Sequence, residues 1–463
     1  MATFSVIKRS ALEGSLRIDA QYYQEKYISN RNRISRFKCV RLGDISSVFR
    51  KGIFDIKASS YTDDGIPFVR IINLKDGLID DSEIVHIPVD IHLKESKTAL
   101  TKGDIILSKT AYPAASLVTL DICNTSQDTI AIKLSDFWRN KLYSGYLVAF
   151  LNSFYGLLLL EQWFQGNIQM HLSLPDAKRV LIPIFKEEYQ QIIDNMWWEA
   201  SKKRELAKLL YCQAEQLLLS ELGLLDWKPR HTLTYVRSFS QVKQANRMDA
   251  EHFQPKYEEL REIIRNYSGG YLKLIDIAVN ANETIEPRAN PEHDFEYIEL
   301  ADINQTIGVI ENAKIIKGKD APSRARMLLR SGDIIASSVE GSLDKVALVS
   351  EEYDGAIGST GFFVLRPRTV SSGYLLALIK SIIVREQMHC ESSGTILAAV
   401  PAKSLKNIIV PNIQQEIQDA ISALVQQSHA ARRESKTLLE KAKRAVEIAI
   451  EEGEEQAMEF LSR

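Results

Sequence analysis

Two groups of side chains are of the kinds that enzymes use in catalysis. His389 adjoins Cys390, and together they supply a thiol nucleophile and a base, but neighbours on a helix point to different faces. Asp81, Glu95 and Lys97 are the residue types of a metal-dependent nuclease. The second half of the chain has no counterpart to their spacing, which favours solvated surface charges.

A methyltransferase motif is also missing. An adenine methyltransferase needs an Asn-Pro-Pro-aromatic motif for the flipped base, and the nearest string, Asn290-Pro-Glu-His293, lacks the aromatic residue. No glycine-rich phosphate loop follows an expected strand. We therefore predict no catalytic residue and no metal ligand in this chain.

Hydrogen bonding to the base edges of DNA is a second kind of chemistry, and it is possible at strand ends. Arg and Lys favour guanine, Asn favours adenine, and Asp or Glu accepts from the cytosine amino group. The candidates in the first half are Arg70, Asn73, Lys75, Ser108, Lys109 and Tyr112, and those in the second half are Glu299, Asp302, Asn304, Ser337, Ser338 and Glu340. The two sets differ in charge, as two different half-sites would require; ordinary surface loops also diverge between repeats. The candidate phosphate contacts are Arg50, Lys51, Arg288, Arg324 and Arg326, for which plain solvated charge is the alternative.

The elements that must position these residues occur twice. The repeated strings are Arg17-Ile-Asp-Ala with Arg247-Met-Asp-Ala, Leu42-Gly-Asp-Ile45 with Leu274-Ile-Asp-Ile277, Gly103-Asp-Ile-Ile106 with Gly332-Asp-Ile-Ile335, Ser144-Gly-Tyr-Leu147 with Ser372-Gly-Tyr-Leu375, and Leu181-Ile-Pro183 with Ile409-Val-Pro411. A shared order at nearly constant spacing indicates an internal duplication.

Each copy predicts one α/β lobe. A short helix precedes several short β runs separated by Gly and Asp, as turns require. A buried helix, a glycine-bearing loop (Gln165–Ile168; Ser393–Ile396) and a strand ending in proline follow. The uncharged stretch 142–160 approaches the length of a membrane span. Its counterpart contains Lys380 and Arg385, which favours a buried helix in both copies.

Each lobe is followed by a long amphipathic helix, over 187–224 and 413–450. The expected seam of the first comprises Ile193, Met196, Ala200, Lys203, Ala207, Leu210, Ala214, Leu217 and Leu224. Both seams are rich in small residues, which allows two antiparallel backbones to approach closely as a coiled coil. We expect Trp197, Trp198 and Tyr211 to flank the seam, exposed for docking of partner proteins.

The predicted fold class is α/β (α+β), with two duplicated lobes separated by a pair of long antiparallel helices in a pseudo-twofold arrangement. The expected boundaries are residues 1–186 for the first lobe, 187–225 for the first long helix, 226–238 for a connector, 239–412 for the second lobe, and 413–463 for the second long helix and tail.

Composition limits the classes of function. The formal net charge of −2 counts against a protein that binds DNA non-specifically on its own. It leaves room for a sequence-specific binder, or for partners that bring positive charge. The four cysteines lie far apart, which indicates neither a zinc finger nor a disulfide framework. A reducing cytoplasm is the simplest compartment.

From about Asp19 to about Glu451, the order and duplication of these motifs resemble the DNA-specificity subunit of type I restriction-modification systems. The resemblance implies two target-recognition domains that bind the two parts of an asymmetric, interrupted double-stranded DNA sequence. It also implies that the paired helices are a spacer and the docking site for two modification subunits, which carry S-adenosylmethionine and methylate adenine. Restriction subunits add ATP-dependent and Mg-dependent cleavage, and the specificity subunit itself binds no cofactor and no membrane.

Other functions stay open at this point. One is the specificity subunit of a type IIB-like fused methyltransferase-nuclease. Others are a stand-alone nuclease or methyltransferase with a degenerate site, and a scaffold that binds only protein.

Overall fold

The computed structural model describes residues 7, 12, 17–166, 170–394 and 398–463. It forms two compact units: unit 1 comprises residues 1–204 and 433–463, and unit 2 comprises residues 205–432. The predicted glycine-bearing loops lie partly outside the described residues, at 167–169 and 395–397, as does most of the predicted first lobe before Arg17.

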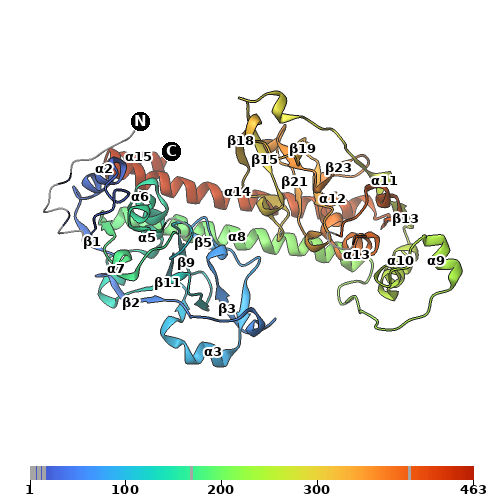
Figure 1. Ribbon diagram of the computed structural model, residues 1–463, viewed down its shortest axis with the longest axis horizontal. Coiled ribbons are helices and arrows are strands. Elements are labelled where there is room, and N and C mark those ends of the chain that lie inside the picture. The colour runs from blue at the N-terminus through green and yellow to red at the C-terminus, as the bar shows by residue number, and fades with distance from the viewer. Residues whose placement is uncertain (1–6, 8–11, 13–16, 167–169, 395–397) are drawn as a thin grey trace. The chain divides into compact units, whose positions relative to one another are not determined.

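Unit 1 contains three sheets (Figure 1). The largest has the order β2 (Ser46–Lys51), β11 (Thr129–Leu134), β8 (Ile105–Ser108), β9 (Ala115–Leu117), β5 (Leu78–Ile79) and β4 (Leu74–Lys75). A second has the order β6 (Val85–Ile87), β3 (Ile66–Val69), β10 (Ile122–Thr125) and β7 (Leu100–Thr101). A third pairs β1 (Cys39–Arg41) with β12 (Leu181–Pro183).

Unit 2 repeats this topology strand for strand. Its largest sheet has the order β14 (Ala278–Asn280), β23 (Phe362–Pro367), β20 (Ile334–Ser337), β21 (Val346–Leu348), β17 (Val309–Ile310) and β16 (Ile303–Asn304). The others are β18 (Lys314–Lys317), β15 (Asp294–Ile298), β22 (Ile357–Ser359) and β19 (Ala325–Leu328), and the pair β13 (Tyr271–Lys273) and β24 (Ile409–Pro411). Even the parallel pairs correspond, β3–β10 with β15–β22 and β5–β9 with β17–β21. The predicted duplication and fold class are confirmed.

The repeated Gly-Asp-Ile-Ile string forms a turn that leads into the central strand of each large sheet. Gly103 and Gly332 have φ angles of 91° and 88°, in the region that favours glycine. Asp104 accepts a hydrogen bond of 2.8 Å from the Thr101 amide, and Asp333 accepts one of 3.0 Å from the Arg330 amide. Glycine supplies the conformation, and the carboxylate satisfies the amide that the turn leaves free.

The repeated Leu-x-Asp-Ile string is a strand in neither unit. In unit 2 it is the short helix α11 (Leu274–Ile277), and in unit 1 it is a turn. Leu274 and Ile277 are both buried. Their spacing of three places both on one face of a helical turn, whereas in a strand they would face opposite ways.

The predicted single buried helix is two helices in each unit. In unit 1, α5 (Ser144–Asn152) and α6 (Phe154–Trp163) meet at 74°. Ser153 caps α6 by accepting from the Gly156 amide, and a Cβ on Gly156 would lie 1.9 Å from the Phe150 carbonyl oxygen. The counterparts are α12 (Ser372–Lys380) and α13 (Ile382–Glu391), which break at Ser381. In the described part of the chain no single helix has the length and apolarity of a bilayer span, and only the bent pair α5–α6 meets the test as two pieces.

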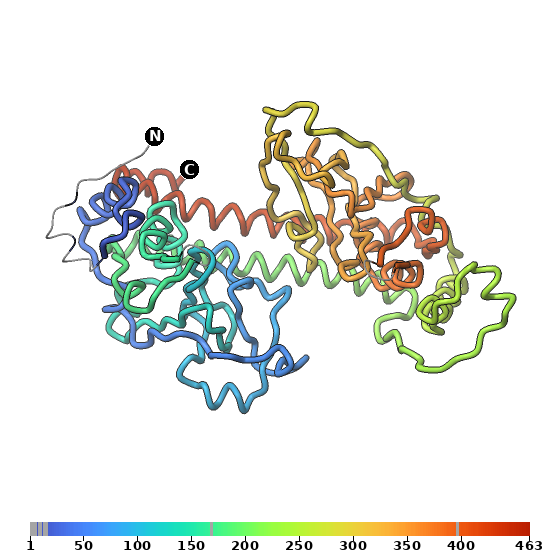
Figure 2. The backbone as a smooth tube through the Cα atoms, in the orientation of Figure 1, coloured from blue at the N-terminus to red at the C-terminus, as the bar shows by residue number. Residues whose placement is uncertain are grey.

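Shorter helices complete both units. They are α2 (Glu25–Ile34), α3 (Val89–Lys94), α4 (Asp136–Arg139), α7 (Leu174–Ala177) and α15 (Glu454–Ser462) in unit 1, and α9 (Phe239–Ala245) and α10 (Pro255–Arg265) in unit 2. Figure 2 shows the red C-terminal part of the chain beside the N-terminal part of unit 1. There Glu447 accepts a hydrogen bond from the Phe154 amide, and Glu451 accepts one from the Tyr155 hydroxyl.

The two long helices, α8 (Glu187–Glu221) and α14 (Gln415–Glu451), end within a few residues of the predicted positions. The buried face of α8 comprises Ile193, Trp197, Ala200, Arg204, Ala207, Tyr211, Ala214 and Leu218, and that of α14 comprises Ile421, Val425, Ser428, Arg432, Ser435, Leu439, Ala442 and Val446. Ser435 donates to the Ala200 carbonyl (2.7 Å), and Ser428 donates to the Ala207 carbonyl (2.6 Å). Small side chains at these positions let the two helices approach closely.

At four positions the predicted seam of α8 is displaced by one residue from the buried face. Met196, Lys203, Leu210 and Leu217 are only half-buried, and the buried positions are the next ones along the helix. The reason is that α8 also packs against its lobes, where Trp197 contacts Gly77 and Gly145, and Tyr211 contacts Lys380. Its buried face is therefore centred differently from a seam that faces a helix alone.

The expected exposure of Trp197 and Tyr211 is also wrong. Trp197 is fully buried in unit 1, where its indole N–H donates to the Gly77 carbonyl at 3.1 Å. A Cβ on Gly77 would lie 2.3 Å from the indole ring, so the glycine is needed for this contact. Tyr211 is buried in unit 2 with Lys380 over its ring at 5.1 Å. Of the three candidates for partner docking, Trp198 alone is partly accessible.

This difference predicts unequal effects of two adjacent substitutions. Trp197→Ala should lower the free energy of unfolding by about 3–5 kcal/mol, because it leaves a cavity against β5 and α5. Trp198→Ala, the matched control, should cost less than about 2 kcal/mol. Denaturant unfolding followed by circular dichroism measures both. Equal losses of stability would contradict the assignment of Trp197 to the core.

Candidate nucleic-acid interface

The strand-end loop of each lobe, Ser108–Tyr112 and Ser337–Glu340, is clamped by two backbone hydrogen bonds to the segment that follows the glycine-bearing loop, 170–172 in unit 1 and 398–400 in unit 2. In unit 1 the bonds join Ala111 N to Met170 O (3.1 Å) and Leu172 N to Lys109 O (2.8 Å). In unit 2 they join Glu340 N to Ala398 O (3.0 Å) and Val400 N to Ser338 O (2.8 Å). The same backbone clamp therefore presents different side chains in the two lobes.

The serines that begin these loops are structural. Ser108 is buried, donates to the Tyr112 carbonyl (2.6 Å) and accepts from the Ala114 amide (2.8 Å). Ser337 is buried and bonds the Val339 amide and the Ser342 hydroxyl. The prediction that these two side chains contact bases is corrected, because their hydrogen bonds close the loop.

Asn73 and its counterpart Asp302 are also part of the framework. Asn73 is buried, accepts from the Arg70 amide (2.9 Å) and donates to the Asp80 carbonyl (2.9 Å). Asp302 accepts from the Glu299 amide at 2.8 Å. Burial raises the pKa of Asp302, and the amide hydrogen bond partly offsets this effect. Both side chains cap short helical turns, so the sequence prediction of base contacts is corrected here too.

Lys75 and its counterpart Asn304 bind carboxylates that follow β5 and β17. Lys75 forms an ion pair with Asp80 at 2.7 Å, and Asn304 donates to Glu311 at 2.7 Å. Burial raises the pKa of Asp80, but the hydrogen bond and charge of Lys75, the Ser82 amide and the charge of Arg204 together lower it to about 2. These partners tie Lys75 and Asn304 to the framework, but neither side chain is buried, and contact with bases stays a prediction for both.

Two of the remaining candidates of unit 1, Lys51 and Lys109, form a cationic cluster with His171. The Lys109 ammonium lies 3.3 Å from His171 Nδ1. Burial and then the charge of Lys51 lower the pKa of Lys109. Burial and then the charges of Lys109 and Lys51 lower the pKa of His171. Mutual repulsion of this kind is relieved when an anion binds.

Aromatic groups and further cations surround the cationic cluster. Tyr112 is 44% exposed, and its hydroxyl donates to the Ile71 carbonyl. Phe54 is 70% exposed, with the Lys51 ammonium 4.3 Å from its ring centre. Arg50 and Lys51 border a cleft that is also lined by Glu95, Lys97 and Lys178. Arg70 is partly exposed and donates to the Glu83 carbonyl at 2.7 Å.

Sequence reasoning missed His171 and Phe54. His171 lies just after the glycine-bearing loop, between the bonded residues Met170 and Leu172. It forms a β-bridge with Thr110, as Ala399 does with Val339 in unit 2. The signal was present, because histidine and alanine occupy equivalent positions of the repeat. It could be recognised only once the clamp showed that this position lies beside the strand-end loop.

The candidate cations of unit 2 are paired instead. Arg324 binds Glu299 (2.9 Å) and the Tyr297 hydroxyl, and Glu299 also binds Lys314. Arg326 pairs with Glu286 at 3.0 Å, and Arg288 donates to the Ala321 carbonyl. Ser338 donates to the Gly361 carbonyl, and Glu340 is half-buried. The face of unit 2 thus carries charges that are largely neutralised within the lobe.

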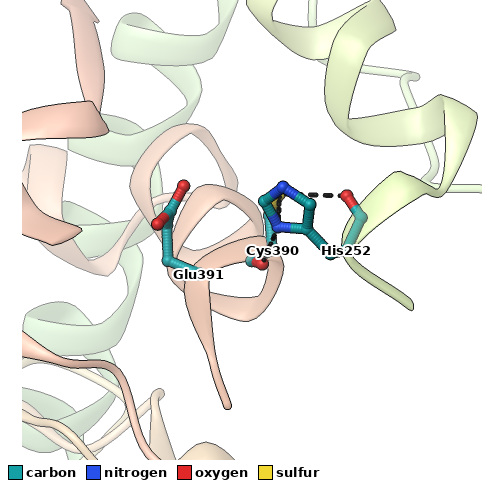
Figure 3. A group of neighbouring side chains, drawn as sticks. All are labelled: His252, Cys390 and Glu391. Atoms are coloured by element: carbon teal, nitrogen blue, oxygen red, sulfur yellow. Dashed lines mark hydrogen bonds between the residues drawn. The ribbon is translucent and has the colours of Figure 1, made fainter. Parts of the chain in front are cut away.

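One group of side chains has the composition of a metal site (Figure 3). The ligand atoms of His252, Cys390 and Glu391 lie within 4.8 Å of one another. His252 Nδ1 must carry a proton, because it donates to the Cys390 carbonyl at 2.8 Å. Arg261 donates to Cys390 Sγ (3.4 Å) and pairs with Glu391 (3.6 Å). A guanidinium already supplies the positive charge, so the geometry does not favour a metal ion here.

Of three comparisons with known proteins, the one with solved structures found matches. No protein-family model and no curated protein matches the chain. The crystal structure of a type I restriction-modification S subunit from M. genitalium matches with 14% identity over 89% of this chain and 95% of that one, at a TM-score of 0.40. The HsdS subunit from Thermoanaerobacter tengcongensis matches with 16% identity over 90% and 97%, at a TM-score of 0.27. A chain from a structure of type I restriction-modification complex assembly matches with 18% identity over 90% and 98%, at a TM-score of 0.29. Each of these three matches spans about nine tenths of this chain at an identity of 18% or less.

Proposed function

We propose that this chain is the DNA-specificity subunit of a type I restriction-modification system, and that each lobe recognises one part of a bipartite, asymmetric target. The observation that supports this function is the duplicated clamp with divergent side chains. Lys109 and His171 in unit 1 stand where Ser338 and Ala399 stand in unit 2. A common framework with different contact residues is what recognition of two different half-sites requires.

In unit 1 the cationic cluster holds phosphates, and neighbouring side chains contact bases. Lysine and arginine bind phosphate oxygens regardless of sequence. Lys109, Arg70 and Tyr112 lie around the strand-end loop, where a long donor or an aromatic ring can reach base edges. An anionic phosphate also offsets the burial and the neighbouring positive charges that lower the pKa of Lys109 and of His171.

Unit 2 recognises its half-site with less electrostatic attraction. The Arg324 guanidinium is shared with Glu299, so contact with a phosphate requires that this ion pair be broken or shared. Ser338 and Glu340 contribute hydrogen bonds, with glutamate suited to the amino group of cytosine. The two lobes therefore differ in the chemistry of contact as well as in the bases they select.

Methylation belongs to partners in this proposal. Two modification subunits with S-adenosylmethionine methylate adenine in the target, and restriction subunits with ATP and Mg cleave unmodified DNA. The long helices α8 and α14 set the distance between the half-sites, which for two lobes on one face of DNA is about one helical turn, roughly 34–36 Å.

Methylation mapping tests the function. The chain is co-expressed with the methyltransferase encoded beside it, and methylated adenines are mapped across the host genome. We expect one asymmetric bipartite sequence with a fixed unspecified spacer, and no methylation when this chain is left out. Methyl transfer or cleavage by the pure chain with S-adenosylmethionine or Mg would contradict the proposal, since it assigns no catalysis to this chain.

The charge difference between the lobes predicts unequal salt dependence. Replacing Lys51 and Lys109 by Gln should lower the slope of log affinity against log salt by about 0.9 for each phosphate that is no longer neutralised. Replacing Arg324 and Arg326 by Gln, a change of equal charge in unit 2, should alter the slope less. Fluorescence anisotropy of the assembled complex on its target measures both. A larger change from the unit 2 pair would contradict the assignment.

A further inference from the structure

A second group of cations lies in unit 1 apart from the strand-end loop. It borders a cavity between α2, β1 and the end of α6, which we call the corner cavity. The lining residues are Tyr22, Arg31, Arg41, Leu159, Gln162, Trp163, Arg179 and Leu181, and none of them is a carboxylate. Arg31 donates to the Tyr22 hydroxyl at 3.1 Å, and the Arg179 guanidinium lies 5.8 Å from the Trp163 ring centre. Three guanidinium groups thus face an apolar and aromatic floor.

Unit 2 has the same cavity between α10, β13 and the end of α13. Lys273 lies opposite Ile409 in the β13–β24 pair, as Arg41 lies opposite Leu181 in the β1–β12 pair. Arg261 lies fourteen residues after Arg247 of the repeated motif, as Arg31 does after Arg17. The cavity is further lined by the cations Arg237, Arg247, Arg265 and Lys406, and by the carboxylates Glu258 and Glu391.

The carboxylates of the unit 2 cavity are already engaged. Glu258 pairs with Arg265 at 2.6 Å, and Glu391 pairs with Arg261 at 3.6 Å. Lys273 and Lys406 are exposed at the same cavity. Both copies of the corner therefore keep an excess of positive charge, although the surrounding residues have diverged.

The repeated Arg-x-Asp motif fixes an apolar side chain beside each corner. Arg17 binds Asp19 through two bonds of 2.7 Å, and Arg247 binds Asp249 at 2.9 Å and 2.6 Å. Each guanidinium also donates to carbonyls at the end of α6 or α13. Ile18, between Arg17 and Asp19, is 91% exposed, and Met248, between Arg247 and Asp249, is 88% exposed. Each corner thus has one exposed apolar side chain held beside it.

Strand register places the corner away from the strand-end loop. Lys51, at the end of β2, pairs with Ile130 of β11, and the adjacent residue, Thr129, pairs with Ser108 of β8. Ser46, at the start of β2, pairs with Leu134. Arg41 precedes Ser46 by a single turn. The corner thus lies beyond the opposite end of β2, on the order of 20 Å from the strand-end loop.

We propose that each corner binds an acidic segment of a partner protein, with one apolar side chain of that segment packed against Ile18 or Met248. Because the corner occurs once in each lobe, the chain binds two copies of the partner. This inference rests on the proposed function, in which the partner is the modification subunit. Exposed apolar side chains and an aromatic floor favour a protein segment over a DNA phosphate as the occupant.

Charge reversal at the corners tests the inference. Arg41→Glu, Lys273→Glu and the double variant are co-purified with the modification subunit, and native mass spectrometry counts the bound copies at increasing salt. Each single variant should bind one of its two copies roughly tenfold or more weakly, and the double variant should lose both. Arg36→Glu, an exposed cation outside both cavities, should keep both copies.

The outcomes separate the inference from the proposed function. A wild-type chain that neither assembles nor binds DNA refutes the proposed function. Full assembly by the double variant, with wild-type assembly intact, refutes the corner site alone. Full assembly with reduced DNA affinity identifies DNA as the occupant and overturns the assignment of a protein. If a charge-reversed variant fails to fold, Arg41→Gln and Lys273→Gln replace it in the test. Each of these should weaken the binding of one copy of the modification subunit by a smaller factor.

Discussion

A buried arginine on each long helix connects that helix to the lobe it serves. Arg432 binds Glu311 through two bonds of 2.5 Å and 3.2 Å, and Arg204 lies near enough to Asp80 to lower its pKa. Removal of one partner from such a buried pair costs about 3–5 kcal/mol, because the other charge is left uncompensated. Asp80 also holds Lys75 and, through its backbone, Asn73. The helix, the β4–β5 hairpin and the adjoining short helical turn therefore keep one relative position. Tyr112 extends this chain of contacts to the strand-end loop through the Ile71 carbonyl.

The need to hold the loops in position also explains why many polar side chains at strand ends are unsuited to DNA contact. Asn73, Ser108 and Ser337 are buried and use their hydrogen bonds to position loops, so contact with a base would leave the loop groups that they bind unpaired. In the proposed function, contact then falls to side chains of the clamped segments that differ between the copies, Lys109 and His171. Their types change between the copies without strain in the framework, so recognition can diverge while the fold is kept.

The sequence predicted the features that repeat or that extend over many residues. The duplication, both long helices and the Gly-Asp turns follow from motif order and from periodicity. The errors arise where tertiary contacts decide. Trp197 is buried because Gly77 leaves room for its indole ring, and the two residues are far apart in sequence. The break at Ser153 depends on the close approach of Gly156 to the Phe150 carbonyl. His171 became a candidate only through its backbone bridge to Thr110. None of these contacts has a periodic signature.

The central claim is that each lobe recognises one half of the target through side chains held by its clamp. The most direct measurement uses the double variant Lys109→Ser and His171→Ala, which places the unit 2 residue types on the unit 1 clamp. The assembled complex is selected against a randomised DNA library, and the enriched sequences are compared with those of the wild type. The account predicts altered base preference in one half of the target only, with the other half and the spacer unchanged. Altered preference in both halves, or a uniform loss of affinity with unchanged preference, would contradict it.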